Sequence, residues 1–141
     1  MYAKIVVGTD GSERAQKAVE HAAELARSLD AELLVIEAIA PIVATVAGLG
    51  EAAAIPQSSI DAVAAELDAV AERLSADGVR ATARLVQRTP ADALVDVAES
   101  EGADLIVVGS RGMSGARRLL GSVPNTVSHR ATCDVLIVHT S

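Results

Sequence analysis

The amino-acid sequence predicts an α/β protein with an open five-stranded parallel sheet, strand order 3-2-1-4-5, and helices on both faces. Two observations predict this class. Short aliphatic runs alternate along the 141 residues with segments in which apolar residues recur every three or four positions, as strands and amphipathic helices require. No hairpin signal joins neighbouring runs, so consecutive strands should be parallel and connected by right-handed helical crossovers.

The expected elements alternate along the whole chain. We expect strands at residues 5–7, 32–37, 79–86, 104–108 and 134–139, and helices at residues 15–29, 60–74 and 123–130. A further helix should start at Thr89-Pro90, which supplies a cap and a first-turn proline, and end at Gly102. Apolar residues alternate with Arg80, Thr82 and Arg84 in the third strand, which predicts an edge strand solvated on one face.

The strand order follows from where the glycine-bearing turns fall. They come after the first and fourth strands, at Gly8 and Gly109. In open parallel sheets a ligand binds beyond the carboxyl ends of the two strands that flank the reversal of strand order. Placing strands one and four side by side gives order 3-2-1-4-5 and brings Thr9 and Asp10 close to Gly109. Strand 134–139 becomes the other edge, and its apolar character on both faces predicts that a partner subunit covers it.

Composition limits both the core and the partners. We expect a single domain over residues 1–141, with an aliphatic core, because half of the residues are hydrophobic and Tyr2 is the one aromatic residue. Stacking of nucleic-acid bases on aromatic side chains is therefore nearly impossible as a binding mode. The formal net charge of −7 also argues against a nucleic-acid surface and against binding to anionic membranes.

Cysteine usage and the chain start predict a cytoplasmic protein. Cys133 is the single cysteine, so neither an internal disulfide nor a cysteine-based metal site is expected. The first residues enter a strand-like run directly, without the pattern of a signal peptide. Residues 38–55 are apolar but interrupted by Pro41, Gly48 and Gly50, and we expect a loop there and no membrane span.

A glycine-spaced segment after the fourth strand predicts an anion site. Gly109 and Gly112 are followed, after eight residues, by Gly121, Ser122 and Val123 at the expected start of a helix. Glycine lets the main chain approach a phosphate closely, and the first turn of a helix offers unpaired N–H groups. Residues 109–141 hold four arginines and one acidic residue, which favours a phosphorylated small molecule. Tight turns and a serine helix cap are the alternative explanation.

The chain resembles the universal stress protein family nearly end to end. The motifs that carry the resemblance are Ile5-Val-Val-Gly-Thr-Asp-Gly-Ser12, Ala103-Asp-Leu-Ile-Val-Val-Gly-Ser-Arg-Gly-Met-Ser-Gly115, Leu120-Gly-Ser-Val-Pro-Asn-Thr-Val-Ser128 and Cys133-Asp-Val-Leu-Ile-Val138. The resemblance implies a cytoplasmic α/β domain that dimerises through its last strand and, in one branch, binds ATP without being a dedicated enzyme. Some similar relatives bind cyclic AMP.

The resemblance also assigns roles to individual residues. It implies an adenine-nucleotide site formed by residues of the turns and strand ends: Gly8, Thr9, Asp10, Ala38, Gly109, Arg111, Gly112, Gly121, Ser122 and Val123. Asp10 would face the ribose hydroxyls or a nucleotide-bound Mg²⁺, although it also fits a cap of the first helix, with Glu13 completing a capping box. Ala38 would meet the adenine edge or serve as a loop spacer. Arg111 would pair with phosphate or stay solvated, and Val123 would pack on the base or on the strand below.

One spacing departs from the family pattern. The family places nine residues between the second glycine and the final Gly-Ser, whereas this chain has eight, 113–120. Three functions therefore stay open: a dimeric regulator that binds ATP or cyclic AMP, a slow ATP hydrolase or nucleotidyl transferase that uses Asp10 and a metal, and a dimeric interaction module without nucleotide. No nucleophile elbow or lysine-ended phosphate loop accompanies these motifs, so we expect at most weak ATP hydrolysis.

Overall fold

The computed structural model describes residues 1–40, 55–110 and 123–140, in which strands and helices alternate in the predicted order. The elements are β1 (Lys4–Thr9), α1 (Glu13–Leu29), β2 (Glu32–Ala38), α2 (Gln57–Ala76), β3 (Arg80–Val86), α3 (Pro90–Glu101), β4 (Leu105–Gly109), α4 (Val123–Arg130) and β5 (Asp134–Val138). The differences from the predicted bounds are a few residues at element ends. Gly102 closes α3 in the left-handed conformation, as predicted.

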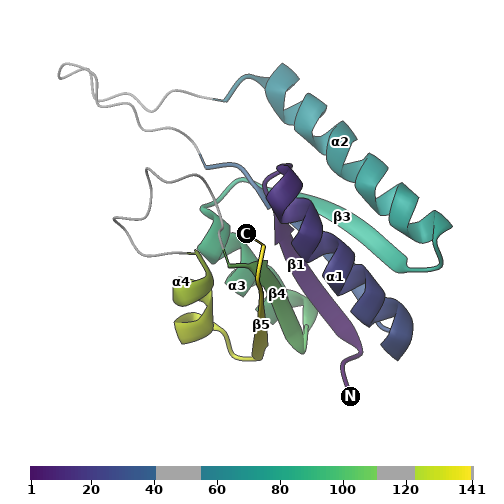
Figure 1. Ribbon diagram of the computed structural model, residues 1–141. Helices are drawn as coiled ribbons and strands as arrows, with labels where there is room; N and C mark the ends of the chain where they lie inside the picture. The colour runs from purple at the N-terminus through teal and green to yellow at the C-terminus, as the bar shows by residue number, and fades with distance from the viewer. Residues whose placement is uncertain (41–54, 111–122, 141) are drawn as a thin grey trace.

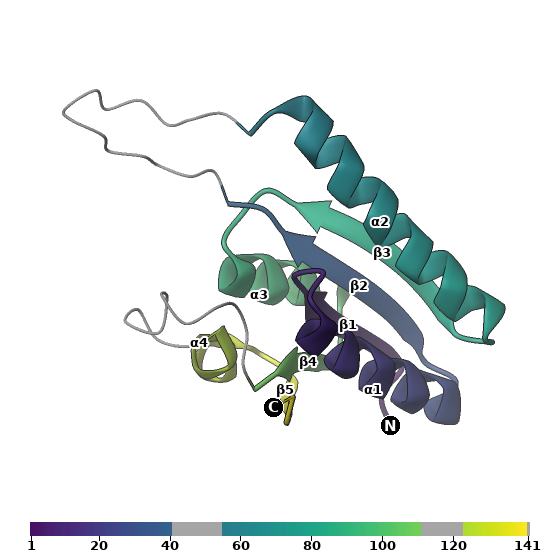
Figure 2. The ribbon, with the colours of Figure 1, turned by 45° about the horizontal axis from the view of Figure 1, so that its top comes forward.

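The strands form one parallel sheet in the order β3-β2-β1-β4-β5, which confirms the predicted topology. Helices α1 and α2 cover one face, and α3 and α4 cover the other (Figures 1 and 2). β3 lies at one edge, with alternate residues exposed, as its sequence predicts. β5 lies at the other edge, where the apolar Ile137 is 47% exposed.

Two aliphatic layers hold the helices on the sheet. On β1, Ile5 and Val7 pack under α1 and α2, whereas Val6 packs against α3 and α4, because successive strand residues point to opposite faces. The buried residues of α1 are almost all alanines: Ala18, Val19, Ala22, Ala23 and Ala26. Small side chains let this helix approach the sheet closely, and the one aromatic residue, Tyr2, is only partly buried against this layer.

The start of α1 differs from the prediction in one respect. Ser12 is the N-cap, and its side chain accepts a hydrogen bond from the backbone N–H of Ala15. Asp10 instead accepts from the backbone N–H of Ser12 at 2.9 Å, which stabilises the turn before the helix. The interpretation of Asp10 as the helix cap is therefore wrong, and its side chain lies in the loop that follows β1.

Candidate functional site

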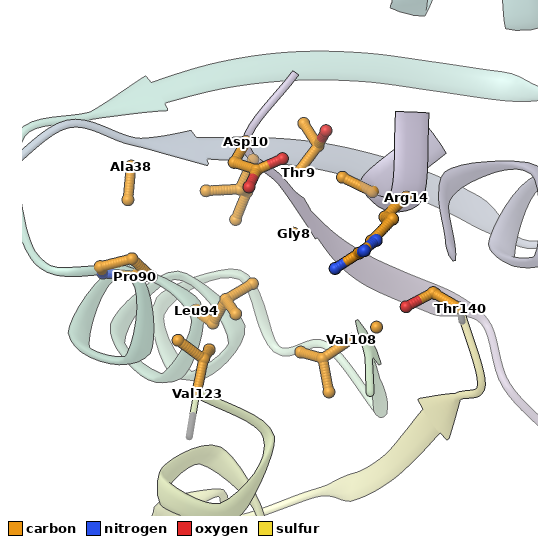
Figure 3. A pocket seen from close by; sticks show the side chains of 13 residues that line it. Gly8, Thr9, Asp10, Arg14, Ala38, Pro90, Leu94, Val108, Val123 and Thr140 are labelled. Carbon is orange, nitrogen blue, oxygen red and sulfur yellow. The ribbon is translucent and has the colours of Figure 1, made fainter. Parts of the chain in front are cut away.

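A pocket opens at the carboxyl ends of β1 and β4, where the strand order reverses. Figure 3 shows side chains from both faces of the sheet converging there. The lining residues are Gly8, Thr9, Asp10, Arg14, Ala15, Ile36, Ala38, Pro90, Leu94, Val108, Gly109, Val123 and Thr140. The location is the one that parallel sheets of this topology use for ligands.

The pocket brings together every predicted site residue that the structure describes. These are Gly8, Thr9, Asp10, Ala38, Gly109 and Val123. The other four, Arg111, Gly112, Gly121 and Ser122, lie outside the described residues. The topology thus juxtaposes segments about a hundred residues apart in sequence, while the ligand-binding roles of the individual residues stay predictions.

Hydrogen bonds from side chains to the backbone fix the loop after β1. The hydroxyl of Thr9 accepts from the N–H of Gly11 at 3.1 Å, and one carboxylate oxygen of Asp10 accepts from Ser12. Gly11 has a φ of 82°, a conformation that side-chain-bearing residues rarely adopt. The loop is therefore pre-shaped, and Asp10 is held at the pocket.

Packing accounts for the two glycines at the strand ends. A Cβ at Gly8 would lie 3.2 Å from both methyl carbons of Leu94, and a Cβ at Gly109 would lie 3.0 Å from the methyl carbon of Thr140. Both distances are tighter than ordinary carbon contacts. Glycine at these positions lets Leu94 and Thr140 close in on the strands, which brings both side chains to the pocket.

The pocket is apolar on one side and polar on the other. The apolar wall consists of Ile36, Ala38, Pro90, Leu94, Val108 and Val123, all from segments that belong to or adjoin the α3 and α4 layer. In Figure 3, Asp10 lies across the pocket from Leu94 and Val123, and Arg14 and Thr140 lie at the right of the pocket, with the Arg14 side chain extending into it. The arrangement suits a small molecule with a flat apolar part and a polar, charged part.

Arg14 and Thr140 line the pocket but are not among the predicted site residues. Arg14 is the second residue of α1, and a cation in a first helical turn opposes the helix dipole, which was an available signal. Thr140 follows the last strand and is 2% exposed, and its hydroxyl oxygen has no hydrogen-bond partner among the described residues. Its burial depends on tertiary packing, so no sequence pattern indicated it.

A titratable carboxyl lies beneath the same loop. Glu37 is paired with Thr9 in the β1–β2 register, and a Cβ at Gly11 would be 3.9 Å from its Oε1 atom. Partial burial, together with the charges of Asp10 and Glu66, raises the pKa of Glu37 to about 7. Near neutral pH this side chain is therefore present in both protonation states.

The described residues contain no cluster of three or more His, Cys, Asp or Glu side chains that could hold a metal ion. Among them there is also no helix with the length and apolar character that crossing a bilayer requires. Asp10 is the one carboxylate among the described lining residues. A role for it toward a nucleotide-bound Mg²⁺ stays a prediction.

Comparison with known proteins decides the family. The family model described as "Universal stress protein family" matches residues 1–139. The chain belongs to the universal stress protein family. A universal stress protein of Mycobacterium tuberculosis is 41% identical over 144 residues, covering 99% of this chain and 98% of the relative. Universal stress protein YxiE of Bacillus subtilis is 35% identical over 147 residues, covering 98% and 99%.

Solved universal stress proteins share the fold. One, crystallised in complex with cAMP, is 39% identical to this chain with a TM-score of 0.76, covering 99% of this chain and 98% of the other. Another, from Archaeoglobus fulgidus and in complex with dAMP, is 26% identical with a TM-score of 0.70, covering 97% and 98%. The likeness confirms the α/β class and the parallel topology of this universal stress protein.

The raised pKa of Glu37 predicts that stability falls as pH rises. The folded-state pKa of about 7 lies above the ordinary value of 4.5, so the folded state holds a proton that the unfolded state loses earlier. The contribution is complete below pH 4.5 and is lost as pH rises through 7. Between pH 5 and pH 8, we expect the free energy of unfolding of Glu37→Gln to rise by about 1–2 kcal/mol relative to that of the wild type. This is less than the full pKa shift implies, because solvent screens the carboxyl.

Urea unfolding at several pH values measures this difference. The matched control is Glu24→Gln, which removes an exposed carboxylate of α1. Its stability difference from the wild type should stay nearly flat over the same range. A Glu37→Gln difference that does not vary with pH would show that Glu37 titrates normally.

Proposed function

We propose that this universal stress protein binds an adenine nucleotide in the pocket between β1 and β4 and acts as a dimeric regulator in the stress response. The observation that carries the proposal is the pocket itself, which joins an apolar wall to a polar end at the reversal of strand order. Relatives of the same fold are complexed with cAMP and dAMP. Both ligands have an adenine base and a single phosphate.

The residues present fit such a ligand. The apolar wall offers aliphatic surface for a purine base, on which Leu94 and Val123 supply branched side chains. Asp10 has a carboxylate oxygen left over from its bond to Ser12, and ribose hydroxyls are suitable donors to it. With ATP as ligand, the same carboxylate would face a phosphate-bound Mg²⁺. The glycine segment from Gly109 to Ser122 would hold the phosphates, and its eight-residue spacer makes the number of phosphates an experimental question.

The dimer is supported by the exposed edge of the sheet. β5 presents an unpaired backbone edge together with Ile137, the one large hydrophobic side chain besides Met1 that is strongly exposed among the described residues. An apolar edge strand that stays uncovered favours aggregation. A second copy of the chain, paired along this strand, would bury both the edge and Ile137.

Nucleotide binding is tested by calorimetry with ATP, AMP and cAMP, with and without Mg²⁺. We expect wild-type protein to bind at least one of them, and Asp10→Ala to weaken binding by roughly tenfold, because a hydrogen bond to a charged group is lost. Asp68→Ala removes an exposed carboxylate on α2, away from the pocket, and should leave affinity unchanged. If no nucleotide binds, the proposal is refuted and the dimeric interaction module without nucleotide is the function that stays open. Rapid turnover of bound ATP would instead favour the ATP hydrolase.

Dimerisation is tested by light scattering coupled to size exclusion at micromolar concentration. We expect a dimeric wild type and a monomeric Ile137→Lys, because the substitution places a charge at the apolar contact. Thr82→Lys adds the same charge to an exposed position of β3, the opposite edge, and should remain dimeric. A monomeric wild type would refute the proposed interface.

A further inference from the structure

Arg14 differs from the other arginines that the structure describes. Six of them are paired within the chain: Arg27 with a backbone carbonyl, and Arg73, Arg80, Arg84, Arg88 and Arg130 with carboxylates. Among the described residues no group pairs with Arg14. Its side chain instead lines the pocket and extends into it from the start of α1 (Figure 3).

Thr140 supplies a second polar group that has no partner among the residues that the structure describes. Its backbone N–H donates to the hydroxyl of Ser110 at 3.1 Å, and its methyl group faces Gly109. These contacts orient the side chain, and Figure 3 shows its hydroxyl directed toward Arg14 and the pocket. A buried hydroxyl without a hydrogen bond is unfavourable, because nothing compensates for its loss of hydration. A ligand oxygen at this position would remove that cost.

Arg14 and Thr140 come from opposite ends of the chain and are complementary to one chemical group. A guanidinium offers several N–H donors and no acceptor, and a threonine hydroxyl adds an O–H donor. A phosphoryl group has oxygen acceptors that match such a donor set, with charge-assisted bonds to the arginine. The first turn of α1, from which Arg14 projects, also carries the positive end of the helix dipole.

We propose that Arg14 and Thr140 form an anion subsite that binds the phosphate of the nucleotide and makes the pocket selective for phosphorylated ligands over nucleosides. The inference rests on the proposed function, because it uses the apolar wall for the base. Leu94, Asp10 and the side chains of Arg14 and Thr140 lie on different sides of one pocket (Figure 3), so a nucleotide with its base on the wall and its ribose at Asp10 would have Arg14 and Thr140 within the same pocket for its phosphate. Arg14 and Thr140 are not part of the glycine segment, and they would add side-chain donors to the backbone N–H groups that this segment would offer the phosphate.

The test compares AMP, cAMP and adenosine, with adenosine measured by competition against a fluorescent AMP analogue. We expect Arg14→Gln to weaken AMP and cAMP binding by roughly tenfold, and Thr140→Val to weaken it by several-fold. Adenosine affinity should be unchanged in both variants, because adenosine has no phosphate. Arg14→Lys, which keeps the charge but not the fork of donors, should retain part of the AMP affinity.

Lys17→Gln is the matched control, because it removes the same charge from α1 three residues further along, at a residue that does not line the pocket. It should leave all three affinities unchanged. Equal losses of AMP affinity and adenosine affinity in Arg14→Gln would indicate that Arg14 has a structural role. That result would overturn the proposed subsite. Unchanged AMP affinity in Arg14→Gln, or an equal loss in Lys17→Gln, would also overturn it. A wild type that binds none of the three ligands would instead refute the proposed function, so the two failures are distinguishable.

Discussion

The pairing of β1 with β4 is the constraint on which the site depends. These strands are neighbours although about a hundred residues separate them, and their register places Ile5 opposite Leu105. The carboxylate of Asp104 reinforces the pairing at its start by accepting from the backbone N–H groups of Ala3 and Lys4 at 2.9 and 3.1 Å. The opposite ends of the same strands then bring Asp10 and Gly109 together. Without this pairing, no pocket would join the two loops.

The chemistry of the pocket follows from the two layers that cover the sheet. The layer of α3 and α4 contributes aliphatic side chains such as Leu94 and Val123, and the start of α1 contributes Arg14. A ligand at the strand ends therefore meets an apolar surface on one side and a cation on the other. Glu37 beneath the loop adds a charge that changes near neutral pH. A proposed ligand contact, Asp10, and a group that titrates near neutral pH, Glu37, thus lie at the same loop after β1.

Much of the fold follows from sequence pattern, whereas the site follows only in part. Period-two alternation predicts that β3 lies at an edge, and the glycine turns after the first and fourth strands predict the strand order. Both signals can be recognised in short stretches of sequence, without knowledge of the tertiary packing. Asp10 and Ser12 are both good cap residues, so the sequence could not tell the cap from the preceding turn. Arg14 and Thr140 come to the same pocket only through tertiary packing. The spacing of the glycines predicts a phosphate site. At Gly8 and Gly109, the close packing of Leu94 and Thr140 already explains why the position holds glycine.

The most direct test of this account is a crystal structure of the protein with AMP. The account predicts a base against Leu94 and Val123, ribose hydroxyls at Asp10, and a phosphate oxygen within hydrogen-bond distance of both Arg14 and the hydroxyl of Thr140. A nucleotide bound elsewhere, or bound in this pocket with its phosphate turned away from Arg14 and Thr140, would contradict it.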